Sequence, residues 1–110
     1  MPKDVYPAAT KELAEERERL APDTLVAFQA FSRQAFAEGA LPAVTKQLIA
    51  VAVAHTTQCP YCIRSHTRQA LRAGASREQV MEAIWVAAEM RAGAAYSHAN
   101  LALDTMNEAS

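Results

Sequence analysis

Proline and glycine are scarce in this chain, and most of them lie between runs of helix-forming residues. Pro22, Pro42 and Pro60 each open such a run, and Gly39 and Gly74 each follow one. Because proline favours the first helical position and glycine the residue after the last, these positions predict helix starts and stops. The alanine-rich composition, with only 3 Gly and 5 Pro, lacks the regular turn signals of an all-β chain. The sequence therefore predicts an all-α fold of about five to six helices.

The 110 residues leave room for a single domain. We expect it to span residues 1–110, with N-terminal helices in residues 1–40 and a core around the two cysteines in residues 41–106. The first expected helix, about residues 8–20, is rich in charged side chains and should lie on the surface. The second, from Pro22 to the stop at Gly39, has an apolar face formed by Leu25, Phe28, Phe31, Ala35 and Phe36.

The helices around the cysteines show clearer patterns. Val44, Leu48, Val51 and His55 recur at spacings of three and four, which predicts one face of a helix that begins at Pro42. A further helix should start with Cys59 as its N-cap and Pro60 at its first position, and end at Gly74. Ser76 and Gln79 have the spacing of a capping box, which predicts a helix from Arg77.

The predicted helix from Arg77 is apolar on nearly every side. So short a chain cannot easily cover such a helix, which favours a homo-oligomer with Ile84, Trp85 and Ala88 in the buried contact. The small residues 92–95 would let another helix approach closely. We expect Trp85, Tyr96 and His98 to serve in packing.

Charge and hydropathy restrict location and partners. The net charge of −1, from 11 basic and 12 acidic residues, gives no attraction for nucleic acid or anionic membrane. The amino terminus lacks the apolar core of a signal peptide, and no run approaches the roughly 20 apolar residues of a membrane span. We expect a cytoplasmic protein. Because lasting disulfides are unusual there, two cysteines at CxxC spacing indicate redox or metal chemistry.

The segment CPYCIRSH, residues 59–66, contains the candidate chemistry. Cys59 and Cys62 are one helical turn apart and can form a disulfide, and both lie at a helix start that favours thiolate. His66, four residues after Cys62, shares its face and could accept the thiol proton or protonate a leaving alkoxide. We expect Cys62 to have the lower thiol pKa, since it has both the first-turn position and the imidazole.

Other interpretations of these residues remain open. The two cysteines could be small core residues, or Cys59, Cys62, His66 and His55 could bind zinc, although structural zinc sites usually take a second ligand pair from a distant segment. His55 completes an apolar stripe and fits a core or helix-end role. Arg64, Arg68 and Arg72 form a basic row that is typical of a solvated face.

The stretch TKQLIAVAVAHTTQCPYCIRSHTRQALRAGAS, residues 45–76, resembles the core of the carboxymuconolactone decarboxylase superfamily, specifically its AhpD-like alkyl hydroperoxidase branch. The resemblance extends from about Leu41 to Met106. The family motif is a glutamate, a CxxC twelve residues later and a histidine four residues after the second cysteine. Those positions hold Gln47, Cys59, Cys62 and His66. The resemblance implies a helical fold assembled as trimers or hexamers, with Cys62 as the peroxidatic thiol and Cys59 as the resolving one.

The leading functional hypothesis is a peroxidase that reduces a hydroperoxide, forms the Cys59–Cys62 disulfide and is recycled by an external dithiol, without metal or organic cofactor. A non-enzymatic redox sensor is the alternative. A decarboxylase ranks lower, because the true decarboxylases act on a lactone and do not depend on the thiol pair.

Gln47 departs from the family glutamate, since an amide cannot relay a proton. Glu89, inside the apolar run 84–90, is the predicted substitute, because burial without a partner favours the protonated carboxyl group. Pairing of Glu89 with Arg91 or with an arginine of another subunit is the alternative.

Overall fold

The computed structural model describes residues 5–109, in which six helices succeed one another. They are α1 (Lys11–Leu20), α2 (Pro22–Phe36), α3 (Ala43–Thr57), α4 (Pro60–Arg72), α5 (Arg77–Ser97) and α6 (Ala99–Ala109). No strand occurs among these residues, and the predicted all-α fold is confirmed. Within the same range, no helix is both long enough and apolar enough to cross a membrane.

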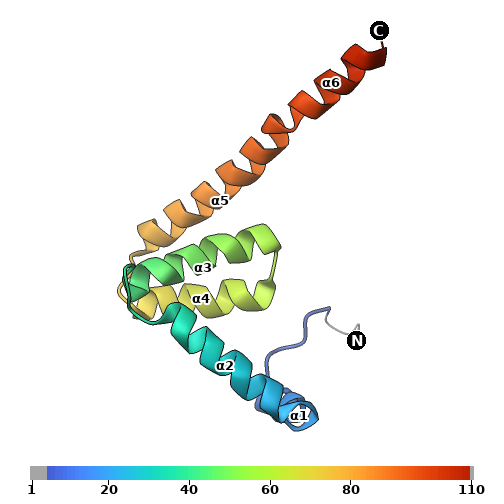
Figure 1. The fold of residues 1–110 in the computed structure, drawn as a ribbon. Helices are drawn as coiled ribbons and strands as arrows, with labels where there is room; N and C mark the ends of the chain where they lie inside the picture. Colours follow the sequence, from blue (N-terminus) through green and yellow to red (C-terminus); the bar gives the residue numbers. More distant parts are fainter. Residues whose placement is uncertain (1–4, 110) are drawn as a thin grey trace.

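The centre of the fold is an antiparallel hairpin of α3 and α4, with α5 packed against α3 (Figure 1). Val51 of α3 is fully buried there, in a cluster with Ala70, Ala75 and Val80. Val44 and Leu48 pack against this cluster, so the predicted apolar face of α3 does form the core side of that helix. The core is small, because its fully buried members are mostly alanine and valine.

A tight reversal between α3 and α4 positions the cysteines. Gln58, after the last residue of α3, adopts the left-handed conformation with φ 57°. The amides of Gln58 and Cys59 both donate to the Ala54 carbonyl, so the chain turns within two residues. Pro60 then takes the first position of α4 and Cys59 is its N-cap, as the sequence predicts. Both cysteines therefore lie at the amino-terminal end of α4.

The start of α5 also follows the sequence prediction. The Ser76 hydroxyl accepts from the Gln79 amide at 3.0 Å, and the Gln79 side chain accepts from the Ser76 amide at 2.8 Å. This reciprocal capping box fixes the first residue of α5 at Arg77. Gly74 in the preceding loop has φ 106°, a conformation that disfavours any other residue.

Two expectations for the N-terminal helices need correction. Helix α2 ends at Phe36, three residues before the predicted stop at Gly39, because Ala37 is already extended. Its predicted apolar face is only partly covered: Phe36 is half-buried, whereas Phe28 and Phe31 remain 62% and 68% exposed. Helix α1 begins at Lys11, after Thr10 caps it, and is exposed throughout as expected.

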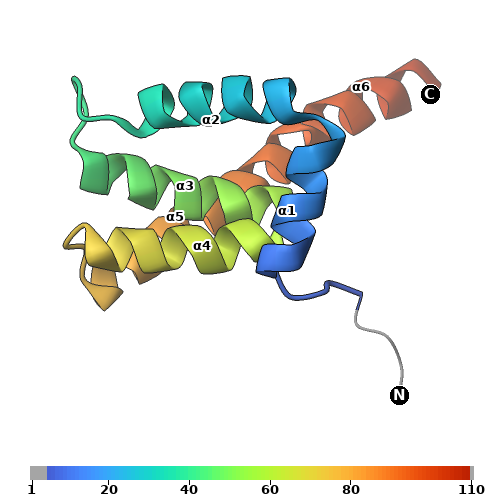
Figure 2. The ribbon, with the colours of Figure 1, turned by 90° about the horizontal axis from the view of Figure 1, so that it is seen from below.

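Helices α5 and α6 form an arm that leaves the hairpin, with only His98 between them (Figures 1 and 2). The Cα radius of gyration is 19.0 Å, against about 13 Å for a compact domain of this length. Trp85 is 66% and Tyr96 is 83% exposed, so their expected packing role is not met within one chain. Apolar surface of this extent is typical of subunit interfaces, and the homo-oligomer stays a prediction.

Candidate functional site

The two cysteines are free thiols whose sulfur atoms lie 2.8 Å apart. The Cys59 and Cys62 side chains are hydrogen-bonded to each other, and the Cys62 backbone amide donates to Cys59 Sγ at 3.3 Å. Cys59 is thus a helix N-cap whose acceptor is sulfur instead of oxygen. The arrangement brings the two sulfurs together at the positive end of the α4 dipole.

These contacts separate the two pKa values in the direction opposite to our expectation. The pKa of Cys59 is lowered, first by the hydrogen bond from the Cys62 side chain and then by that from the Cys62 amide. The pKa of Cys62 is raised, first because its proton is held in the bond to Cys59 and then by burial and the neighbouring negative charge. The prediction that Cys62 has the lower pKa is therefore wrong. Cys59 is therefore the more acidic thiol of the pair, and a base near Cys62 would help it to act as a nucleophile.

His66 lies one turn beyond Cys62 and is held by Gln47. The His66 Nδ1 atom is 2.8 Å from Gln47 Oε1, and Gln47 is only 8% exposed. Gln47 Nε2 donates to Gln69 Oε1 at 3.3 Å, and Gln69 Nε2 donates to the Ser65 hydroxyl at 2.9 Å. The residue at the family's glutamate position is therefore in direct contact with the histidine.

The orientation of the Gln47 amide, whose oxygen faces the ring in this structure, selects the histidine tautomer. An amide oxygen can only accept, so the proton of neutral His66 must be on Nδ1. The Nε2 atom is then left with a lone pair that can accept a proton. Gln47 cannot itself take up a proton, but it orients the ring as a carboxylate would and leaves Nε2 as the basic nitrogen.

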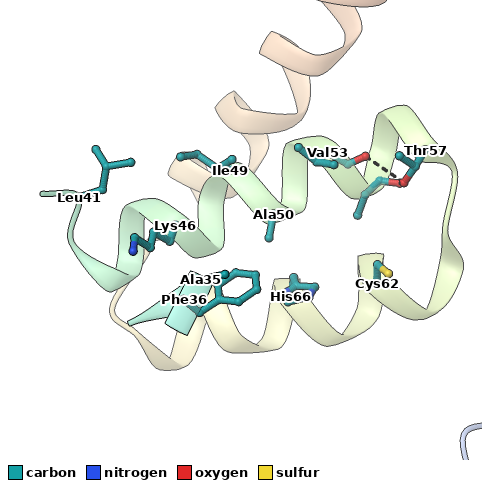
Figure 3. Close-up of a pocket in the computed structure, with 11 residues that line it drawn as sticks. Ala35, Phe36, Leu41, Lys46, Ile49, Ala50, Val53, Thr57, Cys62 and His66 are labelled. Carbon is teal, nitrogen blue, oxygen red and sulfur yellow. Dashed lines mark hydrogen bonds between the residues drawn. The ribbon is translucent and has the colours of Figure 1, made fainter. Parts of the chain in front are cut away.

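Cys62 and His66 open into a cavity of about 470 Å³ between α2, α3 and α4 (Figure 3). Its wall is largely apolar and comes from Ala35, Phe36, Ile49, Ala50, Val53 and Ala54. Lys46 and Thr57 complete it from the two ends of α3, with Leu41 at its edge. The Phe36 ring stacks on the His66 ring at 5.1 Å between centroids, so α2 covers one face of the imidazole. Cys59 does not line the cavity.

Other residues singled out by the sequence lie elsewhere. His55 is half-buried with Nδ1 2.7 Å from the Val51 carbonyl oxygen, consistent with its helix-end interpretation. Glu89 is exposed on α5 and does not line the cavity. The predicted burial of Glu89 within its own chain is therefore wrong. Arg91 donates to the Thr56 carbonyl at 2.5 Å, and no ion pair joins it to Glu89 within residues 5–109.

No three His, Cys, Asp or Glu side chains gather as a possible metal site in the described part of the chain. Sequence reasoning missed Gln69, Phe36 and Lys46. Gln69 is detectable in principle, since it lies seven residues after Cys62 and so shares its helical face. Phe36 and Lys46 reach the site through the tertiary packing of α2 and α3, which no local pattern reveals.

The fold and the site together define a class of protein: a helical dithiol protein with a CxxC pair at a helix start and a histidine beside an apolar cavity. Residues 22–105 match the family model described as the carboxymuconolactone decarboxylase family. The chain belongs to this family.

Two similar proteins of known sequence are described as uncharacterized. The chain is 67% identical over 82 residues to an uncharacterized protein in the cox locus of Paracoccus denitrificans, covering 74% of each chain. It is 43% identical over 82 residues to an uncharacterized protein of Cupriavidus necator, covering 74% of this chain and 73% of that one.

Solved structures share the fold. A protein from Methanobacterium thermoautotrophicum matches with a TM-score of 0.72 and 35% identity, covering 76% of this chain and 93% of the other. A carboxymuconolactone decarboxylase family protein from Legionella pneumophila, crystallised in its apo form, matches with a TM-score of 0.68 and 34% identity. The match covers 88% of this chain and 86% of the Legionella chain.

Proposed function

We propose that this protein is a cytoplasmic thiol peroxidase of the AhpD-like branch, which reduces organic hydroperoxides through a Cys59–Cys62 dithiol/disulfide cycle. The observation that carries the proposal is a pair of free thiols 2.8 Å apart, one of which borders an apolar cavity beside a histidine. The cytoplasm suits this chemistry because its reductants keep thiols available. The paired thiols, one of which borders the cavity, favour this activity over decarboxylation.

The first step uses Cys62 and His66. His66 Nε2 accepts the Cys62 proton, and the Cys62 thiolate attacks the terminal oxygen of the hydroperoxide. The O–O bond breaks, Cys62 becomes a sulfenic acid, and the leaving alkoxide takes the proton from His66 to give the alcohol. Because Cys59 raises the pKa of Cys62, the nearby base is necessary for this step.

The second step uses Cys59, the more acidic thiol of the pair, as its thiolate. It attacks the Cys62 sulfenic sulfur and displaces hydroxide, which is protonated to water, and the disulfide forms. An external dithiol then reduces this disulfide and is itself oxidised. The sum is hydroperoxide plus dithiol giving alcohol, water and a disulfide.

Peroxide consumption with dithiothreitol as the dithiol tests the proposal. The wild-type protein should turn over many times, and Cys62→Ser should remove the activity. Without dithiothreitol, Cys59→Ser should consume one equivalent of peroxide and stop, with a sulfenic acid on Cys62 that dimedone traps and mass spectrometry locates. Peroxide loss at the rate of dithiothreitol alone, in the correctly folded wild-type protein, would refute the proposal.

One contact favours redox sensing as a second candidate. Tyr61, between the two cysteines, donates its hydroxyl to the Pro7 carbonyl at 2.6 Å and meets the Tyr6 ring edge-on at 5.9 Å. Formation of the disulfide would change the first turn of α4 and could release this N-terminal segment. Under this candidate, one stoichiometric oxidation increases proteolysis near Pro7 without turnover.

A further inference from the structure

The polar groups of the cavity are separated along its length. Cys62 and Thr57 lie toward one end and Lys46 toward the other, with His66 and Phe36 between them (Figure 3). The hydrogen bond between Gln47 and His66 places these residues at the same level of the hairpin. Lys46 is therefore about one turn of helix from the level of Cys62, a separation of roughly 5 Å or more along α3 before its own long side chain is added.

The ammonium group of Lys46 is a cation with more N–H donors than its hydrogen bond to the protein uses. Its ammonium group donates to the Ala37 carbonyl at 2.5 Å, which uses one of three N–H donors. No carboxylate within residues 5–109 lies at ion-pair distance from it. Glu38, close in sequence, is turned toward the start of α3, where its carboxylate accepts from the Ala43 amide at 3.2 Å. Lys46 as a whole is half-buried, but the hydrogen bond of its ammonium group to Ala37 is exposed, so a carboxylate can approach that group from solvent.

The size of the cavity excludes the smallest peroxide as a complementary ligand. A volume of about 470 Å³ compares with about 30 Å³ for a water molecule. Hydrogen peroxide would leave the apolar wall in contact with water, whereas an alkyl or aryl chain would cover it.

Resting on the proposed function, we propose that the substrate is an amphipathic carboxylate: an organic acid whose carboxylate pairs with Lys46, whose apolar chain lies along α3, and whose hydroperoxide group reaches Cys62. The Lys46 ammonium selects the charged head and sets the depth at which the chain lies. Ile49, Ala50 and Val53 contact the chain between the two ends. Lys46 is thus a specificity residue, distinct from the thiols that perform the reaction.

Binding of unreactive probes tests this inference without any turnover. Octanoate and 1-octanol share the apolar chain and differ in charge, and calorimetric titration of the reduced protein compares their affinities. We expect octanoate to bind at least tenfold more tightly, as a charge-assisted hydrogen bond would give. Lys46→Met should abolish this preference, Lys46→Arg should retain most of it, and Lys11→Met, an exposed lysine of α1, should leave it unchanged.

Equal binding of the two probes to the wild-type protein, or a preference that persists in Lys46→Met, would overturn the inference. The preference is the ratio of the octanoate affinity to the octanol affinity. A substitution that weakens the binding of both probes equally leaves this ratio unchanged. A second experiment separates the two proposals. It compares kcat/KM for two hydroperoxides, one that bears a carboxylate and one that is neutral. Octanoate preference without peroxide turnover retains the carboxylate site and rejects the peroxidase, whereas turnover without preference does the reverse.

Discussion

Replacement of Gln47 by leucine removes the side chain that orients His66 while keeping a similar volume. Gln47 makes one hydrogen bond to His66 and one to Gln69. Each contributes about 1 kcal/mol net, and a buried partner left unpaired costs about 1–3 kcal/mol. Greater apolar burial by leucine offsets part of this loss. We expect Gln47→Leu to lower the free energy of unfolding by about 2–3 kcal/mol, equivalent to a fall in Tm of roughly 10 °C for a domain of this size.

The same variant should disturb catalysis, since the Nδ1 proton of His66 loses its acceptor. Peroxide turnover should fall about tenfold or more, within the usual range for loss of a general base. Gln47→Glu keeps the acceptor and adds a negative charge that favours the protonated imidazole, so its turnover should equal or exceed that of the wild type. Histidine ¹⁵N chemical shifts should show a protonated Nδ1 in the wild type and in this second variant.

Urea unfolding at equal protomer concentration measures the stability change, because assembly would make Tm depend on concentration. Gln34→Leu, at an exposed position of α2, is the matched control and should change stability by less than about 0.5 kcal/mol. If Gln47→Leu were as stable and as active as Gln34→Leu, the hydrogen-bond chain would have no role in holding His66.

Other consequences can be checked separately. Iodoacetamide should label Cys59 before Cys62 near neutral pH, and Cys59→Ser should lower the pKa of Cys62, because Cys59 is the main cause of its rise; preferential labelling of Cys62 in the wild type would contradict this. Light scattering should give a multiple of 11.9 kDa, and Trp85→Glu should reduce it, whereas a wild-type monomer at micromolar concentration would remove the basis for the interface. Glu89→Gln should keep wild-type turnover, and a tenfold fall would reinstate the proton relay. Gln58→Gly should stabilise the α3–α4 turn by about 0.5–1 kcal/mol, because glycine adopts a positive φ without strain.

The helix starts were predictable because their signals are local. The Pro60 position, the Cys59 cap and the Ser76 capping box act within a few residues, and the structure reproduces them. The order of the two thiol pKa values was not predictable from spacing. It depends on the contacts of the Cys59 sulfur, which is hydrogen-bonded to the Cys62 side chain and accepts from the Cys62 amide.

The environment of the site also lay beyond local patterns. Contact between Gln47 and His66 requires the α3–α4 hairpin to close in one register, and the sequence gives no measure of that register apart from the family resemblance. Burial of Glu89 was inferred from its apolar neighbours along the chain, but Glu89 lies on an exposed face of α5, although nearby Ala87 is buried and Arg91 reaches α3. The local sequence shows which side chains are neighbours along the chain. It does not show which other segments of the fold pack over them.

Cys62 borders the cavity and Cys59 does not, which has a kinetic consequence for the proposed cycle. If the dithiol attacks the sulfur of Cys59, it does not have to enter the cavity in which the hydroperoxide meets Cys62. Initial-rate plots at several fixed dithiol concentrations should then be parallel, as for a ping-pong enzyme. With attack at Cys59, excess hydroperoxide should not act as a competitive inhibitor of the dithiol.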